Sequence, residues 1–344
     1  MSYRIRYSTI IPMLKLLKKL KEKGIDRSEI EEILSHEDYE FEFSRYKGRV
    51  SKEEYIDYIL NLPSISDKAL ENEDLRVHHD FYLRFLEKPD RYINEADKWI
   101  SILTTDLFDR QIEEALKGLP EDVELPNLNF IFTAGIGRSG GYVHKNGMHF
   151  DILQLMINNQ SMEEFGTVIS HEVHHQGMET IHNKLDLNNL PLEQIFFVYF
   201  SGEGLAVKYC NNAEGVMSKA IHAGAKNIGM DKFTWKYLND DFYNTMEHFR
   251  KTLNQIRNND IKTLEELEQD FYDYWMNPYI EGQSKNEIPK LLQFRLYSFG
   301  NEIWGIIHDC FGKDKVYETL RNPENFRAVF NEALEKIGHA EYKI

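Results

Sequence analysis

Residues 161–182 read SMEEFGTVISHEVHHQGMETIH, and this stretch decides the fold. It predicts one long helix. Ser161 and Glu164 have the spacing of a capping box, in which each side chain accepts a hydrogen bond from the other residue's backbone N–H. Apolar residues recur at helical spacing behind this cap, at Phe165, Val168 and Ile169.

Two histidines within this helix, His171 and His175, are four residues apart, so their side chains lie on one face, one turn apart. Two imidazoles in that arrangement can bind one zinc ion. Glu172 adjoins the first histidine, and in the pattern His-Glu-x-x-His such a glutamate is the general base. The run therefore predicts a site for one Zn²⁺ per chain. We expect His174 to be a bystander on a solvated face of the helix.

A third zinc ligand is expected outside this helix, because a catalytic zinc usually has three protein ligands and one water. Glu203 is the first choice, and 27 residues separate it from His175. Gly202 and Gly204 flank it, and we expect them to remove side chains that would crowd the ion.

Other third ligands agree less well with the spacing. Glu193 and Glu179 are the remaining carboxylate candidates. His182 lies nearly two turns beyond His175, about 10.5 Å along the helix axis, so it is not expected to share the ion. A metzincin would need a Gly and a His at fixed offsets after the motif, and Gly177 and His182 each miss by one position.

The segment Gly-Glu-Gly-Leu-Ala at residues 202–206 resembles the Asn-Glu-Gly-Phe-Ala segment that supplies the third zinc ligand in gluzincin aminopeptidases. Most of the chain is similar to a bacterial family of zinc-dependent peptidases of unknown biological function. The matching runs lie at residues 34–39, 43–46, 51–55 and 297–300. The resemblance implies a gluzincin-like metallopeptidase with zinc on His171, His175 and Glu203.

Two features depart from the gluzincin aminopeptidases. Those enzymes carry an upstream Gly-Ala-Met-Glu-Asn motif that grips the substrate amine, whereas residues 135–141 here read Gly-Ile-Gly-Arg-Ser-Gly-Gly. We therefore expect an endopeptidase. The acidic residue often found four positions after the third ligand is Val207 here, so the sequence identifies no hydrogen-bond partner for a zinc-binding histidine.

A hydrogen-bond donor near the developing oxyanion is also needed to stabilise the transition state. The resemblance implies this catalytic role for Tyr297. That residue lies 94 positions beyond Glu203, and a core tyrosine near Gly300 is an interpretation that stays open. His222 and His308 are weaker candidates for the donor.

Helical periodicity dominates residues 1–118, which we interpret as a helical N-terminal region. One helix is expected to begin near Ser28, with Glu31 completing a capping box. No strand is predicted in this region. The other helical patterns cover residues 9–23, 51–62, 66–87 and 93–117.

Residues 119–344 are predicted to form a zincin-like catalytic region, which begins with a proline-containing linker. Apolar residues alternate over 128–132 and 148–152, which predicts two strands around a glycine-rich loop. The strand at 148–152 is expected to align an extended peptide by edge pairing. The remainder is mostly helical, so the predicted fold class is mainly α with a small β-sheet (α+β).

The chain of 344 residues has 57 acidic and 41 basic side chains, for a formal net charge of −16. This acidic balance disfavours a nucleic-acid partner. Nowhere do about 18 apolar residues run together, so no membrane span is expected. The N-terminus lacks the pattern of a signal peptide, and Cys210 and Cys310 read as two reduced thiols. We therefore expect a cytoplasmic protein.

Together these patterns predict a zinc-dependent metallopeptidase that hydrolyses a peptide or protein substrate, with Glu172 as general base. One alternative is a zinc-binding regulatory protein without turnover. An intact Glu172 argues against it, because a structural zinc needs no base and has no open coordination position. A second alternative is a zinc hydrolase of a non-peptide amide. The sequence leaves the oligomeric state open.

Overall fold

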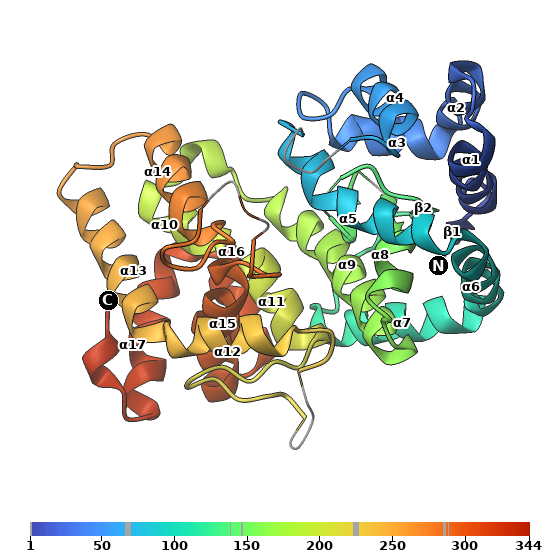
Figure 1. Cartoon of the computed structure of the whole chain (residues 1–344). Coiled ribbons are helices and arrows are strands. Elements are labelled where there is room, and N and C mark those ends of the chain that lie inside the picture. The colour runs from blue at the N-terminus through green and yellow to red at the C-terminus, as the bar shows by residue number, and fades with distance from the viewer. Residues whose placement is uncertain are drawn as a thin grey trace. The chain divides into compact units, whose positions relative to one another are not determined.

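The computed structural model describes residues 2–65, 70–137, 139–145, 147–222, 227–284, 287 and 289–344 (Figure 1). The chain divides into two compact units. Unit 1 comprises Met1–Arg110 and Leu125–Gly166, and unit 2 comprises Gln111–Glu124 and Thr167–Ile344. Each unit is therefore assembled from two separate stretches of the chain.

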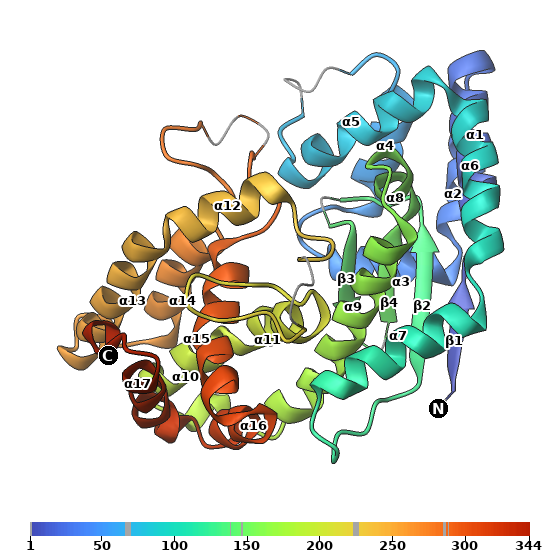
Figure 2. The same ribbon diagram turned by 90° about the horizontal axis from the view of Figure 1, so that it is seen from below.

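Unit 1 contains a four-stranded sheet in the order β1-β2-β4-β3 (Figure 2). β1 and β4 both run parallel to β2, and β3 runs antiparallel to β4. The register sets Ile5 opposite Phe130 and Phe132 opposite Phe150. The bounds of the strands are β1 (Tyr3–Arg6), β2 (Leu128–Thr133), β3 (Gly141–His144) and β4 (Gly147–Asp151).

The strands predicted at 128–132 and 148–152 are confirmed as β2 and β4. The expectation that the second of them is an edge strand is wrong. β4 is paired with β2 on one side and with β3 on the other, so its backbone donors and acceptors are used within the sheet. Residues 141–144 read as part of a glycine-rich loop in the sequence, and their pairing with β4 covers that edge.

The prediction that the N-terminal region has no strand is also wrong, because Tyr3–Arg6 forms β1. Four residues are too few to show an alternating pattern, and Arg4 and Arg6 make this run look polar. β1 exists because it pairs with β2, more than a hundred residues further along the chain. A local pattern does not contain information about such a partner.

Unit 1 also contains helices. Those that lie wholly in this unit are α1 (Ile10–Lys23), α2 (Arg27–Leu34), α3 (Glu37–Arg45), α4 (Lys52–Asn61), α5 (Glu73–Glu87), α6 (Pro89–Ile102) and α8 (Ile152–Ile157). Two further helices, α7 (Thr105–Gly118) and α9 (Met162–His182), contribute residues to both units.

The predicted start of the second helix is corrected by the structure. α2 begins with a capping box of Asp26 and Glu29, not with Ser28 and Glu31. Aspartate accepts a backbone N–H as well as serine does, and here it comes two residues earlier.

The helical pattern predicted over 93–117 is divided into α6 and α7. Leu103 leaves the helical region with ψ 65°, and its backbone N–H bonds the carbonyl of Ile100. The helix predicted over 66–87 is described from α5 onward, which Asn72 caps through two backbone N–H groups. Its first residues, 66–69, lie outside the described residues.

The core of unit 1 is an aromatic layer on the sheet. Phe108 of α7 lies 4.4 Å from Phe130 of β2, measured between ring centroids. Phe132 and Phe150 stack at 5.0 Å on neighbouring strands, and Phe165 of α9 lies 5.9 Å from each of them. The first turns of α9 are therefore anchored on the sheet.

Unit 2 is helical in its described residues. After α9 it contains α10 (Leu192–Tyr199), α11 (Ser201–Cys210), α12 (Lys232–Asp240), α13 (Phe242–Arg257), α14 (Leu264–Asp270), the π-helix η3 (Phe271–Trp275), α15 (Arg295–Phe311), α16 (Lys313–Arg321) and α17 (Phe326–Lys336). Short 3₁₀ turns are η2 (Leu187–Asn189), η4 (Pro323–Asn325) and η5 (Ala340–Tyr342). The predicted fold class, mainly α with a small sheet, is confirmed.

The described helices include none with the length and apolar character needed to span a membrane.

The core of unit 2 is also aromatic, and it lies at the start of α11. Phe200 lies 4.6 Å from Trp275, and Trp275 lies 4.9 Å from Phe299 of α15. Phe249 of α13 lies 5.0 Å from Phe299. All four side chains are buried. Phe200 directly precedes α11, so this cluster fixes where that helix begins.

Two glycines let α11 and α15 approach each other closely. A Cβ added at Gly204 would lie 2.3 Å from the backbone carbon of Gly300, and one added at Gly300 would lie 2.5 Å from the oxygen of Phe200. The expectation that Gly204 leaves room for a metal ion is therefore wrong, because its missing side chain leaves room for α15. A Cβ at Gly202 would make only an ordinary contact, 4.0 Å from His182.

Candidate metal centre

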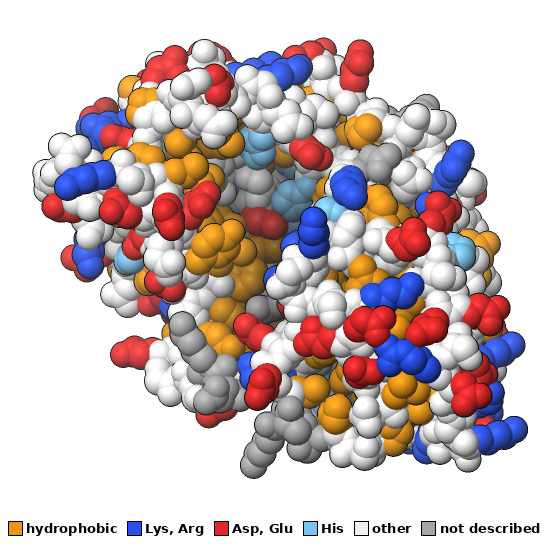
Figure 3. Space-filling view, turned by 90° about the horizontal axis from the view of Figure 1, so that it is seen from above, with side chains coloured by type: hydrophobic (Ala, Val, Ile, Leu, Met, Phe, Trp, Pro, Cys, Tyr) orange, Lys and Arg blue, Asp and Glu red, His pale blue; other side chains and the backbone are white. Residues whose placement is uncertain are grey.

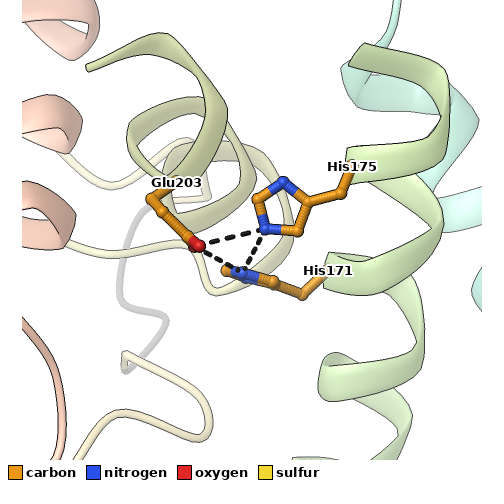
Figure 4. A group of neighbouring side chains, drawn as sticks. All are labelled: His171, His175 and Glu203. Atoms are coloured by element: carbon orange, nitrogen blue, oxygen red, sulfur yellow. Dashed lines mark hydrogen bonds and ion pairs between the residues drawn. The ribbon is translucent and has the colours of Figure 1, made fainter. Parts of the chain in front are cut away.

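Two helices of unit 2 present the predicted ligands to one another (Figure 4). His171 and His175 project from successive turns of α9, and Glu203 projects toward them from the first turn of α11. The predicted cap of α9 is present, since Ser161 and Glu164 accept hydrogen bonds from each other's backbone N–H.

The three ligand atoms form a small triangle. Nε2 of His171 lies 3.0 Å from Nε2 of His175, and Oε2 of Glu203 lies 3.1 Å from the first and 3.2 Å from the second. Bonds of about 2.0–2.1 Å in a tetrahedral zinc site would separate ligand atoms by roughly 3.3 Å. The triangle therefore has the size and the donor atoms of the protein side of such a site.

The electrostatics of the triangle also favour a cation. Burial alone would raise the pKa of Glu203, but the charge of His175 and hydrogen bonds with His171 and His175 hold it below its usual range. For His175 burial lowers the pKa, whereas the charge and hydrogen bond of Glu203 and the charge of Glu172 raise it to about 9. A proton is thus held strongly between these groups, in the place where a metal ion could bind.

Glu172 lies beside the triangle, on the same helix as the two histidines. Glu172 is buried, and its pKa is raised above the usual value. Burial is the largest cause, and the charge of Glu203 acts in the same direction. The charges of His175 and His171 oppose the shift. A carboxylate whose pKa is raised is a better proton acceptor than an exposed one. These properties are those that a general base needs.

Tyr297 lies against the site from the first turn of α15. Its ring is parallel to the ring of His171, with centroids 6.2 Å apart. Burial, the charges of Glu203 and Glu172, and a hydrogen bond to Glu203 raise the pKa of its hydroxyl far above the usual value. The same side chain packs on an apolar cluster of Val207, Ala213 and Trp235. Tyr297 is therefore both a neighbour of the ligands and a partly buried packing residue.

Asn211, at the C-terminal end of α11, is a site residue that sequence reasoning missed. Its Oδ1 lies 2.8 Å from Nδ1 of His171, on the side of the imidazole away from Glu203. The signal was present in the spacing. Asn211 follows Glu203 by two intervals of four residues, with Val207 between them, so all three lie near one face of the helix.

The alternative carboxylates do not face the triangle. Glu193 bonds the guanidinium groups of Arg257 and Arg327. Glu179 is exposed on α9 and accepts a hydrogen bond from Gln176.

The alternative histidines also have other surroundings. Nε2 of His182 lies 2.8 Å from the hydroxyl of Ser201, and burial lowers its pKa to about 4. His222 is exposed. His308 lies beside Asp309, with its Nδ1 3.3 Å from that carboxylate.

The expectation that His174 lies on a solvated face is wrong. It is fully buried, its Nε2 lies 3.2 Å from the hydroxyl of Tyr317, and its ring packs beside Tyr209. Tyr317 donates to the carbonyl of Gly118, so it can accept a hydrogen bond from a neutral His174. The helix is covered on this side as well, which its sequence of consecutive histidines does not show.

Comparison with known proteins gives one match. A model of the family described as "Putative zinc dependent peptidase (DUF5700)" matches residues 30–338, which include all three residues of the triangle. No curated protein and no solved structure matches the chain. Because the match covers most of the chain, the resemblance seen in the sequence is confirmed, and the chain belongs to this family of "putative zinc dependent" peptidases.

Proposed function

We propose that this chain is a zinc-dependent metallopeptidase that binds one Zn²⁺ through His171, His175 and Glu203. The observation that carries the proposal is the triangle of two imidazole nitrogens and one carboxylate oxygen, 3.0–3.2 Å apart. Three protein ligands of this kind are typical of catalytic zinc, which keeps a further position for water or substrate. The family description, which names zinc, supports the same metal.

Zinc held in this site would polarise the scissile carbonyl and lower the pKa of water. Glu172 is the proposed general base: it takes a proton from the attacking water and delivers it to the leaving amine. Its burial beside the ligands supports this role, because burial raises its pKa and so makes it a better proton acceptor.

Tyr297 is the proposed donor to the oxyanion that develops on the carbonyl. Its hydroxyl stays protonated at neutral pH, since burial and the carboxylates of Glu203 and Glu172 raise its pKa. A fixed, protonated hydroxyl in a buried site is a stronger hydrogen-bond donor to developing charge than water is.

We infer an endopeptidase acting on a peptide or protein. The chain lacks the Gly-Ala-Met-Glu-Asn segment with which gluzincin aminopeptidases hold the substrate amine.

The net charge of −16 argues against a nucleic-acid substrate. On the face that Figure 3 shows, acidic and basic side chains are interspersed. The thiols of Cys210 and Cys310 are free, which suits the reducing cytoplasm.

The buried Glu172 argues against only one of the two alternatives. A zinc-binding regulatory protein would have no use for Glu172 next to its ligands. A zinc hydrolase of a non-peptide amide would use the same groups in the same way, and only its substrate would differ.

The test compares wild type with Glu172→Gln in two assays, zinc content and cleavage of a diverse peptide library read by mass spectrometry. Wild type should contain about one zinc per chain and cut bonds inside the peptides. Glu172→Gln should keep the zinc but lose hydrolysis, because an amide cannot accept the proton.

The matched control is Glu179→Gln, which removes the charge of an exposed glutamate on the same helix. It should behave as wild type in both assays. Zinc without any cleavage by wild type would favour the regulatory protein, and cleavage restricted to non-peptide amides would favour the other hydrolase. Cleavage by Glu172→Gln at the wild-type rate would show that another group is the base.

A further inference from the structure

His171 has two ring nitrogens with different partners. Nε2 faces Glu203 and His175, and Nδ1 lies 2.8 Å from Oδ1 of Asn211. An imidazole can offer a lone pair at Nε2 while neutral only if its proton is on Nδ1. The group that faces Nδ1 therefore decides whether His171 is ready to bind a metal.

The amide of Asn211 is fixed in the orientation that this requires. Its Nδ2 donates to the carbonyl of Ile228 at 2.7 Å, so its oxygen is the atom directed at His171. An amide oxygen only accepts hydrogen bonds, so Nδ1 of His171 must be the donor. The contact therefore selects the tautomer with an unprotonated Nε2.

Asn211 itself is held from several sides. It is 4% exposed, its backbone N–H bonds the carbonyl of Val207, and its backbone carbonyl accepts from the N–H of Ile228. With the side-chain bond, Asn211 and Ile228 make a two-point contact. A partner held this firmly can fix the plane of the imidazole as well as its proton.

The neighbouring residue, Asn212, anchors the same loop without contacting the site. Its amide oxygen accepts from the backbone N–H of His222 at 2.9 Å, and its Nδ2 donates to the carbonyl of His222 at 3.4 Å. Asn212 is 5% exposed, so the two asparagines are similarly buried. Of the two, Asn211 has the hydrogen bond to a ligand of the triangle, and Asn212 has the left-handed backbone, with φ 50°, which glycine adopts without strain.

We propose that Asn211 is the positioning residue of the metal centre, which holds His171 as the Nδ1–H tautomer with its Nε2 lone pair directed at the ion. This inference rests on the proposed metal site. Asn211 takes the place of the acidic residue missing at Val207, one helical turn further along α11. Because its amide is neutral, it orients the imidazole without adding a negative charge next to it.

The first experiment measures zinc affinity by competition with a chromophoric chelator in wild type, Asn211→Ala, Asn211→Asp and Asn212→Gly. Loss of a hydrogen bond to a metal-binding histidine typically weakens affinity 10- to 100-fold, and we expect that loss for Asn211→Ala. Asn211→Asp keeps an acceptor facing Nδ1 and should stay within about tenfold of wild type. Asn212→Gly removes the neighbouring amide without strain at its left-handed backbone and should bind zinc as wild type does.

The second experiment reads the tautomer directly, by ¹⁵N NMR of histidine-labelled, metal-free protein at pH 7.5. In wild type the proton of His171 should be on Nδ1, and in Asn211→Ala this preference should weaken. A wild-type proton on Nε2 would overturn the proposal. So would unchanged zinc affinity in Asn211→Ala, or an equal loss in Asn212→Gly, which would assign the effect to the loop.

Neither readout depends on hydrolysis, so the two proposals can fail separately. Wild type that binds zinc and cuts no peptide contradicts the peptidase proposal alone. Wild type that binds no zinc contradicts the metal site and, with it, the role of Asn211 there.

Discussion

At the scale of single residues, the centre depends on atoms that repel one another when no cation lies between them. The Nε2 atoms of His171 and His175 are 3.0 Å apart, and two unprotonated lone pairs at that distance are unfavourable. A shared proton relieves this, and so would a metal ion. We therefore expect metal binding to release a proton, which makes the affinity depend on pH.

Removal of one ligand should abolish stoichiometric zinc. In His171→Ala, His175→Ala and Glu203→Ala we expect zinc content after dialysis to fall from about one per chain to well below half. The measurement is metal analysis by mass spectrometry. His222→Ala removes an exposed histidine outside the triangle and is the matched control. Full zinc retention in the three ligand variants would refute the site.

Tyr297→Phe should separate binding from catalysis. The variant keeps the ring that stacks on His171 and loses only the hydroxyl. We expect unchanged zinc content and a kcat lower by about 10²–10³, with a smaller effect on KM, because the donor acts in the transition state. Tyr272→Phe, at an exposed tyrosine, is the control. A wild-type kcat in Tyr297→Phe would show that the hydroxyl has no role in catalysis and that Tyr297 only packs against its neighbours.

The sequence predicts the residues of the triangle because their spacing is local. His171, Glu172 and His175 lie within five positions on one helix, and Glu203 stands between two glycines in a short segment that resembles a known third-ligand segment. Asn211 has no such motif. Its spacing from Glu203 places it near the same helix face, but its role depends on tertiary contacts of its amide with His171 and Ile228.

At the scale of elements, α9 was predictable from its cap and its apolar spacing, whereas the close contact of α11 with α15 was not. Gly204 and Gly300 are 96 positions apart, and nothing in the sequence around either glycine indicates that the two are in contact. Only the structure shows that each glycine removes a clash with the other helix. β1 and β3 were missed for the same reason, since their stability comes from partners in the sheet.

The two glycines beside Glu203 should therefore respond differently to the same substitution. In Gly204→Ala the added methyl meets the backbone of Gly300, and we expect a loss of at least about 1–3 kcal/mol in the free energy of unfolding. In Gly202→Ala it meets only an ordinary contact, so we expect stability unchanged or raised by up to about 1 kcal/mol. Urea unfolding of both variants measures this. Equal effects would contradict the packing role of Gly204.

At the scale of the whole molecule, the two compact units do not follow the order of the chain. Unit 1 takes residues from both sides of the stretch 111–124, which belongs to unit 2. The predicted division into residues 1–118 and 119–344 was drawn from composition and from the linker, which report on solvent exposure along the chain. Strand pairing between distant segments leaves no such local mark.

Stability should depend on pH through Glu42, which lies in the core of unit 1. Its carboxyl accepts hydrogen bonds from Thr133 at 2.7 Å and from the N–H of Ile136 at 3.1 Å. Burial is the largest cause that raises its pKa, to about 8. The folded state therefore favours the protonated form, so this contribution is complete below about pH 4.5 and is lost as the pH rises through 8.

Urea unfolding at pH 5.5 and 7.5 should show this loss in wild type. Each pH unit in the window lowers the free energy of unfolding by up to ~1.4 kcal/mol through this one group. Glu42→Gln cannot ionise and should have the shallower dependence. Glu40→Gln, an exposed glutamate on the same helix, should keep the wild-type slope. A slope in Glu42→Gln as steep as in wild type would assign the dependence to other groups.

The pairing of β1 with β2 has a consequence for synthesis on the ribosome. The partners of Tyr3–Arg6, residues 128–131, are made more than a hundred residues after it. At about 5–20 residues per second, the strand waits roughly 6–25 s for its neighbour. Arg4 and Arg6 keep it charged during that interval, and charge on an unpaired strand discourages pairing with the wrong chain. The two arginines that make this strand look polar in the sequence thus also disfavour wrong strand pairing before β2 has been made.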